Sequence, residues 1–261
     1  MINKEINQLL DTMAQLRHPQ TGCRWDCEQD FKSLRQYTLE ETYEVFDAIE
    51  NKDWKNLKEE LGDLLFQIVF YAQIAEEKQL FSFADIVKTL NKKLIQRHPH
   101  VFEETNNTLS AEEISTLWDK RKLKEYQQKS VLDNIPATMP ELLKAVKLCK
   151  KAAIIGFDWH DIAPVFAKLD EEIAELKQAI AGKNTDEISD ELGDVLFVCT
   201  NLARHLNTDP QLAMRAANKK FERRFRQVEV LARQQHPLET SYALDYLDKL
   251  WNKVKKMNNN H

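Results

Sequence analysis

The sequence has few residues that break helices and few that cross-link chains. It contains five Gly, seven Pro and four Cys among 261 residues, and 30% of its residues are charged. So little Gly and Pro beside so much charge argues against a turn-rich β architecture and predicts an all-α fold. Cys23 and Cys27 are not followed by a second pair at zinc-ligand spacing, and nothing in the sequence requires disulfides.

Long apolar runs and an excess of positive charge are also missing. No run approaches the about 20 residues that span a bilayer, and the N-terminus lacks the basic and apolar regions of a signal peptide. We therefore expect a cytoplasmic protein with no membrane partner. The net charge of −5 predicts no nucleic-acid partner, although cations cluster locally at Lys219, Lys220, Arg223, Arg224 and Arg226.

Several common nucleotide-binding and catalytic motifs are absent as well. The sequence has no G-x-x-x-x-G-K-[ST] phosphate loop, no G-x-G-x-x-G fingerprint and no nucleophile elbow. Any phosphate chemistry must therefore rest on other residues.

An acidic signature is present, and it occurs twice. Five acidic residues of the first half recur in the second half at a constant step of 131 residues: Glu40, Glu41, Glu44, Glu60 and Asp63 as Glu171, Glu172, Glu175, Glu191 and Asp194. The apolar frame around them recurs too, because Leu61-Gly62-Asp63 matches Leu192-Gly193-Asp194. Duplication on this scale indicates two copies of one domain.

The length suits two domains, each able to bury a core. Pro136 and Pro140 lie in a stretch without helical periodicity between the two copies. We therefore predict an N-terminal domain over residues 1–130, a linker over 131–140 and a C-terminal domain over 141–261.

Helical periodicity predicts one pair of helices in each copy, over residues 39–49 and 54–77 and over residues 166–180 and 186–205. Gly182 is the expected stop of the third of these helices, and Thr185 the expected N-cap of the fourth. The short connections make the helices of each pair antiparallel neighbours. Acidic residues three apart share a helix face, so four carboxylates should converge in each copy.

Such a cluster is chemically unusual for a helix pair. Carboxylates beside the apolar run from Leu64 to Phe70 should repel one another, which raises their pKa values unless cations neutralise them. A ligand set of oxygens alone suits Mg²⁺, with Mn²⁺ as a substitute. The candidate metal ligands are Glu172, Glu175, Glu191 and Asp194, and a second candidate metal site comprises Glu41, Glu44, Glu60 and Asp63. Acidic helix faces are usually only solvated, but here the spacing is kept while the residues between diverge.

Basic and aromatic positions of the second copy form a further pattern. Lys220 and Arg224 share a helix face, as do Trp251 and Lys255. Such pairs alone are usually surface charge, but beside a metal cluster they predict a phosphate site, with Arg gripping two oxygens and Lys acting as a point charge. Trp251 and its first-copy counterpart Trp118 could each stack on a base or lie in a core.

The doubled E-E-x-x-E…E-x-x-D signature resembles that of the MazG nucleoside triphosphate pyrophosphohydrolases. The segments Tyr37 to Glu44, Arg97 to Phe102 and Asn201 to His205 look like those of two-domain bacterial members. The resemblance implies two tandem MazG-like helical domains whose four-helix cores are completed by homodimerisation. It also implies Mg²⁺-dependent hydrolysis of nucleoside triphosphates, ribo or deoxy, to the monophosphate and pyrophosphate.

Carried onto this sequence, the resemblance implies a nucleotide surrounded by Lys168, Glu171, Glu172, Lys220, Arg224, Trp251 and Lys255. Glu171 and Glu172 are the candidate catalytic residues, with Glu171 placed to orient or deprotonate the attacking water. The counterpart of Lys168 in the first copy is Tyr37, so we expect the second copy to carry most of the activity.

Two other classes of protein remain as alternatives. A non-catalytic helical regulator could bind the same nucleotide, and release of pyrophosphate would separate it from an enzyme. A ferritin-like di-iron oxidase also gathers carboxylates between helices, but it needs E-x-x-H, whereas the second motif here ends in Asp63 or Asp194.

Overall fold

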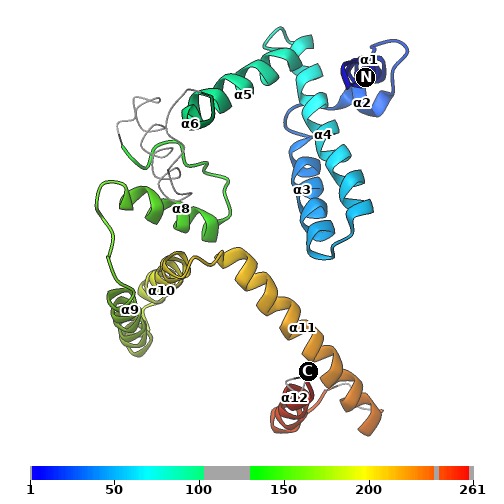
Figure 1. Cartoon of the computed structure of the whole chain (residues 1–261). Helices are drawn as coiled ribbons and strands as arrows, with labels where there is room; N and C mark the ends of the chain where they lie inside the picture. The colour runs from blue at the N-terminus through cyan, green and yellow to red at the C-terminus, as the bar shows by residue number, and fades with distance from the viewer. Residues whose placement is uncertain (1, 103–129, 238–240, 259–261) are drawn as a thin grey trace. The chain divides into compact units, whose positions relative to one another are not determined.

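The structure is a computed structural model that describes residues 2–102, 130–237 and 241–258. The chain divides into two compact units, Met1–Leu109 and Ser110–His261. Throughout the described residues the regular elements are helices, and no strand occurs among them (Figure 1). The predicted all-α fold is confirmed.

The helices of the first unit are α1 (Ile2–Leu16), α2 (Arg24–Glu28), α3 (Arg35–Glu50), α4 (Trp54–Glu77), α5 (Phe83–Arg97) and α6 (Pro99–Phe102). α3 and α4 pack against each other as a hairpin (Figure 1). Between them, Lys52 adopts a left-handed φ of 54°, and the Asp53 side chain caps α4 by accepting a hydrogen bond from the Asn56 backbone N–H. The predicted helix pair is confirmed, although α3 begins four residues earlier than its apolar periodicity indicates.

The core of the first unit lies where α1 crosses α4. Its buried side chains are Met13, Leu34, Val69, Phe70 and Ile74. At the end of the two helices, Arg17 donates a hydrogen bond of 2.7 Å from Nη2 to Glu77 Oε2. This hydrogen bond is the main cause that lowers the pKa of Glu77.

The helices of the second unit are α8 (Glu141–Ala153), α9 (Ala163–Gly182), α10 (Thr185–His205), α11 (Pro210–Gln235) and α12 (Leu244–Asn258). α9 and α10 form a hairpin that corresponds to α3 and α4. The prediction of Thr185 as the N-cap is wrong, because Asn184 fills that position and its side chain accepts from the Asp186 backbone N–H. Gly182 is the last helical residue, and the left-handed turn falls one residue later at Lys183, with φ 59°.

A second core holds α11 against α12. It comprises Val228, Ala232, Leu250 and Val254. None of the described helices is long and apolar enough to cross a membrane.

The segment predicted as a linker begins beside α8. Lys151 on α8 donates hydrogen bonds to the carbonyl oxygens of Val131, at 2.9 Å, and Asp133, at 2.6 Å. The start of this segment is therefore tied to the second unit. The division into residues 1–130, 131–140 and 141–261 stays a prediction.

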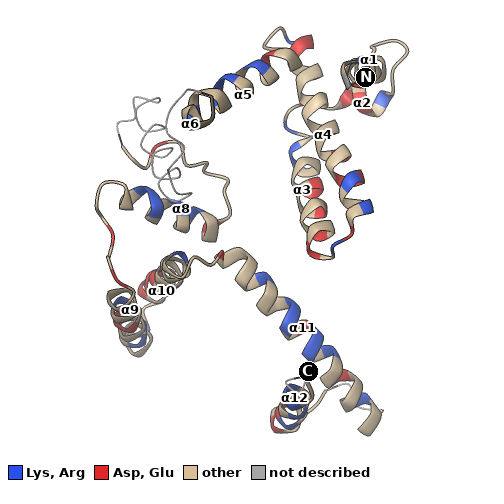
Figure 2. Ribbon diagram, in the orientation of Figure 1, with Lys and Arg blue, Asp and Glu red and all other residues tan. Residues whose placement is uncertain are grey.

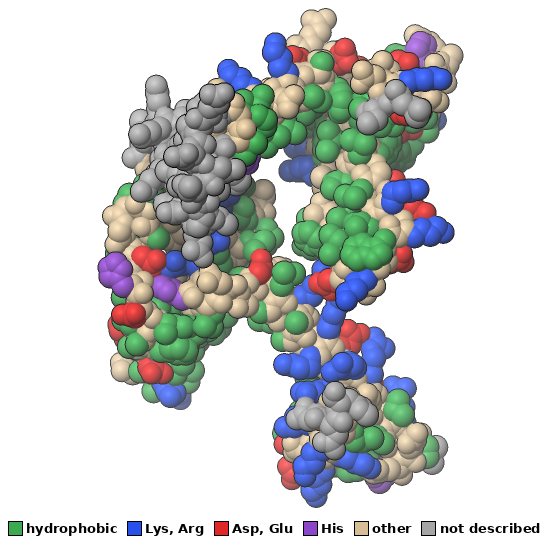
Figure 3. Space-filling view, viewed as in Figure 1, with side chains coloured by type: hydrophobic (Ala, Val, Ile, Leu, Met, Phe, Trp, Pro, Cys, Tyr) green, Lys and Arg blue, Asp and Glu red, His purple; other side chains and the backbone are tan. Residues whose placement is uncertain are grey.

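Both hairpins expose apolar side chains on a face that the described part of the chain leaves open. Figure 3 shows hydrophobic side chains gathered over α3 and α4 and again over α9 and α10. Exposed positions of the two hairpins include Leu61, Leu65 and Ile68 on α4 and Leu192, Leu196 and Phe197 on α10. Leu61 and Leu192 occupy equivalent positions of the repeat, as do Leu65 and Leu196, so the same face is left open in both units.

Candidate active site

The hairpin of α9 and α10 brings three of the predicted carboxylates together. Glu172 and Glu175 on α9 and Glu191 on α10 each offer an oxygen, and these atoms lie within 4.8 Å of one another. Glu172 is buried, with 4% of its surface exposed, whereas Glu175 and Glu191 are half-buried. The sequence prediction that these helices face each other with their acidic positions is thereby confirmed for this trio.

Glu172 has two oxygens in different environments. Lys168, one turn earlier on α9, places Nζ 2.7 Å from Oε1 of Glu172 and 2.7 Å from Oε1 of Glu171. These hydrogen bonds, to Glu171 and then to Glu172, raise the pKa of Lys168. The other oxygen of Glu172, Oε2, is buried and has no hydrogen-bond partner. A buried acceptor without a donor is costly and unusual, and a bound cation would remove that cost.

The crowding of acids has the electrostatic effect that the sequence predicts. The pKa of Glu175 is raised, first because its protonated form donates a hydrogen bond to Glu172, then by burial and by the charge of Glu172. Burial raises the pKa of Glu191, and the charges of Glu172 and Asp194 raise it further. A hard divalent cation bound by these oxygens would offset the repulsion.

The first unit contains an equivalent trio. Oxygens of Glu41, Glu60 and Asp63 lie within 4.8 Å of one another. Burial raises the pKa of Glu41, and the charges of Asp63 and Glu44 add to it. At the position of Lys168 this unit has Tyr37, whose ring packs edge-on against Trp25 at 5.6 Å, so no ammonium from that position balances the trio.

Two predicted ligands lie beside the trios rather than in them. Glu44 is exposed, and its negative charge raises the pKa values of Glu41 and Glu60. Asp194 is exposed on α10, on an open acidic depression that it shares with Asp186, Glu187, Ser189, Asp190 and Gly193. The structure thus places both residues next to the clusters without adding them to the sets that share 4.8 Å.

The predicted basic and aromatic residues form a separate group on the last two helices. Figure 2 shows Lys and Arg along α11, which carries Lys220 and Arg224. Trp251 on α12 lies 5.4 Å from the Phe221 ring and packs against the second core, and Lys255 follows it one turn later. Arg224 has a buried Nε without a hydrogen-bond partner. Among the described residues no ion pair or hydrogen bond joins this group to the carboxylates of α9 and α10. The counterparts Trp118 and Lys122 lie outside the described residues.

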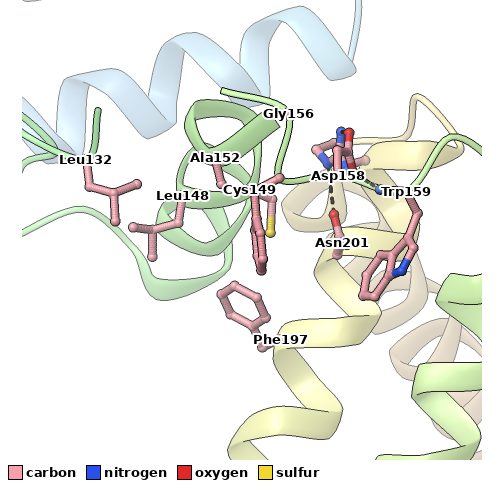
Figure 4. Close-up of a pocket in the computed structure, with 11 residues that line it drawn as sticks. Leu132, Leu148, Cys149, Ala152, Gly156, Asp158, Trp159, Phe197 and Asn201 are labelled. Atoms are coloured by element: carbon pink, nitrogen blue, oxygen red, sulfur yellow. Dashed lines mark hydrogen bonds and ion pairs between the residues drawn. The ribbon is translucent and has the colours of Figure 1, made fainter. Parts of the chain in front are cut away.

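The sequence reasoning missed a cavity in the second unit. It has a volume of about 480 Å³ and lies between α8, the turn after it and α10 (Figure 4). Trp159, Phe197 and Asn201 are among its lining residues, together with Asp158 and Arg204. None of these five was a predicted site residue.

A repeated motif would have revealed this cavity. Gly22-x-x-Trp25 recurs as Gly156-x-x-Trp159, 134 residues later, each time before the helix with the acidic motif. Both glycines are required by the backbone: a Cβ on Gly22 would lie 2.4 Å from the carbonyl oxygen of Leu16, and Gly156 has φ +89°. The motif therefore marks a conserved turn geometry that delivers a tryptophan to each unit.

A tandem all-α protein, in which each of two helical hairpins gathers carboxylates from facing helices, is the class that this fold and site define. The family model described as "MazG nucleotide pyrophosphohydrolase domain" matches residues 29–102 and 163–229, one hairpin in each unit. The chain belongs to the MazG family.

Full-length relatives agree with this assignment. The chain is 44% identical over 259 residues to the nucleoside triphosphate pyrophosphohydrolase of Escherichia coli strain K12, covering 97% of both chains. It is 40% identical over 252 residues to a Thermotoga maritima protein named nucleoside triphosphate pyrophosphohydrolase/pyrophosphatase MazG, covering 96% of this chain and 95% of that one. An uncharacterized Bacillus subtilis protein, YabN, is 36% identical over 98% of this chain and 53% of its own length.

Proposed function

We propose that this protein is a nucleoside triphosphate pyrophosphohydrolase, which converts ribo- or deoxyribonucleoside triphosphates to the monophosphate and pyrophosphate. The observation that carries the proposal is the buried, unpartnered Oε2 of Glu172 inside a trio of carboxylates. The names of the two full-length relatives at 44% and 40% identity support the same activity.

We propose that Glu172, Glu175, Glu191 and Asp194 hold Mg²⁺, or Mn²⁺ as a substitute. The donor set fits, because it consists of oxygens alone and leaves one buried oxygen without a partner. When bound, such a cation neutralises phosphate charge and lowers the pKa of a coordinated water. The equivalent set in the first unit, Glu41, Glu44, Glu60 and Asp63, is a second metal site in this proposal.

The side chains around the trio have distinct tasks. Lys168 fixes Oε1 of Glu172, so that Oε2 keeps one position, and it holds Glu171 beside the trio through a second contact of 2.7 Å. Glu171 is exposed enough to reach a water molecule, and in our proposal it orients that water and accepts its proton. The attack is in line with the leaving pyrophosphate and needs no covalent protein nucleophile.

We further propose that the active form is a homodimer. The open apolar faces of both hairpins need cover, and a second copy offers the same surface in a symmetric arrangement. Pairing would also give the carboxylates of one protomer access to Lys220, Arg224, Trp251 and Lys255 of the other. Lys220 and Arg224 would then bind the triphosphate, whose charge the acidic cluster alone would repel.

The test is pyrophosphate release from a panel of ribo- and deoxyribonucleoside triphosphates with Mg²⁺, run beside a Glu172→Ala variant. Release by the wild type and its loss in the variant support the enzyme. Nucleotide binding without release would support the non-catalytic regulator. Light scattering of the same samples measures the mass, and a stable, active monomer of about 30.6 kDa would contradict the proposed dimer.

A further inference from the structure

The first unit fills its centre with a ring of its own chain. Phe70 on α4 is completely buried. Its ring meets Trp25 edge-on at 6.5 Å and an interplanar angle of 88°, and it meets Phe66 at 5.5 Å and 75°. The three rings form a continuous aromatic cluster next to the carboxylates of Glu60 and Asp63 on the same helix.

The second unit keeps the outer two rings and lacks the middle one. Trp159 matches Trp25 through the repeated glycine motif, and Phe197 matches Phe66 at the step of 131 residues. At the same step, the counterpart of Phe70 is Asn201. Trp159, Phe197 and Asn201 line the cavity of about 480 Å³, so the second unit has a space where the first unit has a ring (Figure 4).

The polar group at this space is held in one orientation. Asn201 is 6% exposed, and its Oδ1 accepts a hydrogen bond of 2.8 Å from Arg204 Nε. Arg204 can only donate, so the Asn201 amide must turn its oxygen toward it and leave Nδ2 to donate elsewhere. Arg204 is itself fixed by Asp158, whose Oδ2 accepts from Nη1 at 2.9 Å. No partner of the Nδ2 group is found among the described residues.

The cavity is continuous with the proposed active site. Phe197 and Asn201 follow Asp194 by three and seven residues and lie on the same face of α10. At about 1.5 Å of rise per residue, Asn201 lies roughly 10 Å beyond Asp194 along the helix axis. A ligand with phosphates at the carboxylates and a ring at Asn201 would therefore extend along one helix face.

We infer that this cavity is the nucleobase subsite of the second unit: the base takes the place that the Phe70 ring occupies in the first unit. Trp159 and Phe197 contact the two sides of the base, and the Asn201 Nδ2 group donates a hydrogen bond to an acceptor on its edge. This inference rests on the proposed function, because it assigns part of the same substrate. Purines and pyrimidines both present such acceptors, so the subsite selects a planar heteroaromatic ring rather than one base.

The experiment measures nucleoside binding without metal and without turnover. Adenosine and uridine are titrated to millimolar concentration, and binding is followed by ligand-observed NMR on the full chain. Asn201→Phe restores the ring of the first unit, and we expect it to weaken nucleoside binding at least about 10-fold. Gln178→Phe, at an exposed position of α9, controls for adding a ring. Trp159→Ala is a second variant, expected to weaken binding even where Asn201→Phe folds poorly.

The outcomes separate this inference from the proposed function. Nucleosides that bind Asn201→Phe and Trp159→Ala as tightly as the wild type, or that fail to bind the wild type, would overturn the subsite while pyrophosphate release still supports the enzyme. Binding abolished by Trp251→Ala but kept by Asn201→Phe would also overturn it, because the base would then stack on α12. Nucleoside binding that depends on Asn201 in a protein without pyrophosphate release would retain the subsite and reject the enzyme.

Discussion

The ammonium of Lys168 lies 2.7 Å from Oε1 of Glu172, and Glu172 is the acidic residue that the second unit buries most completely among those described. Removing a partner from a buried carboxylate leaves an uncompensated charge, which destabilises a fold. We therefore expect Lys168→Met to lower the Tm of the metal-free protein by several degrees and Mg²⁺ to restore much of the loss. Lys177→Met, an exposed lysine of the same helix, is the control. Equal melting of both variants would mean that the ion pair contributes nothing.

The two units should differ in activity. Glu172→Ala or Asp194→Ala removes a ligand beside Lys168, and we expect at least about a 100-fold loss of pyrophosphate release, as for disruption of a metal site. Glu41→Ala or Asp63→Ala should cost much less, because the first unit has Tyr37 where the second has Lys168. A larger loss from the changes in the first unit would reverse this assignment.

Crowding of the carboxylates predicts an unusual separation of stability from activity. Glu175 has a raised pKa beside Glu172, so its charge opposes folding when no cation is bound. Glu175→Gln should abolish Mg²⁺-dependent turnover, leave the metal-free protein as stable as the wild type or slightly more stable, and remove most of the thermal stabilisation by Mg²⁺. Melting curves with and without Mg²⁺ test this, with Asp170→Asn on α9 as the control. A metal-free Glu175→Gln variant that melts well below wild type would identify a structural network.

The same pKa shifts predict a pH dependence. Carboxylates must lose their protons to bind a cation, so Mg²⁺ affinity should fall on acidification at a higher pH than ordinary glutamates would give, because the pKa values of Glu175 and Glu191 are raised. In the metal-free protein, groups with raised folded-state pKa values contribute stability that is complete below the unfolded pKa and is lost as pH rises through the folded pKa. Melting with and without Mg²⁺ between about pH 4 and 8 should show stabilisation by Mg²⁺ growing with pH. Stabilisation independent of pH would refute the prediction.

Arg224 should contribute to nucleotide binding more than to folding. A charge-assisted hydrogen bond to phosphate is worth roughly 1.5–3 kcal/mol, so Arg224→Ala should weaken binding of a non-hydrolysable triphosphate about 10-fold or more. Isothermal titration gives the affinity, and Arg223→Ala, an exposed neighbour, is the control. Unchanged affinity in a folded variant would mean that Arg224 is ordinary surface charge.

The helices and the carboxylate trios could be predicted because both depend on local spacing. Glu172 and Glu175 are three apart, and the short turn at Lys183 and Asn184 returns the chain so that Glu191 faces them. Periodicity fixes which residues share a face, and a short turn leaves little choice of partner.

The cavity could not be predicted in the same way. Its walls combine Leu148 on α8, Trp159 in a loop and Asn201 on α10, and no periodic pattern relates these three positions. Only the comparison of Phe70 with Asn201 across the repeat reveals that one unit lost a ring. The pairing of Lys168 with both Glu171 and Glu172 was likewise invisible, because a sequence does not say which of two neighbouring acids a lysine selects.

The exchange of Phe70 for Asn201 also bears on how the two units breathe. A centre closed by three rings opens only when the unit unfolds, whereas a space of about 480 Å³ next to α10 lets nearby backbone amides exchange through smaller fluctuations. Hydrogen exchange should therefore be slow around Phe70 regardless of ligand, and fast around Asn201 until something occupies the space. One copy of the duplicated hairpin would act as a rigid body, and the other would become rigid only on binding.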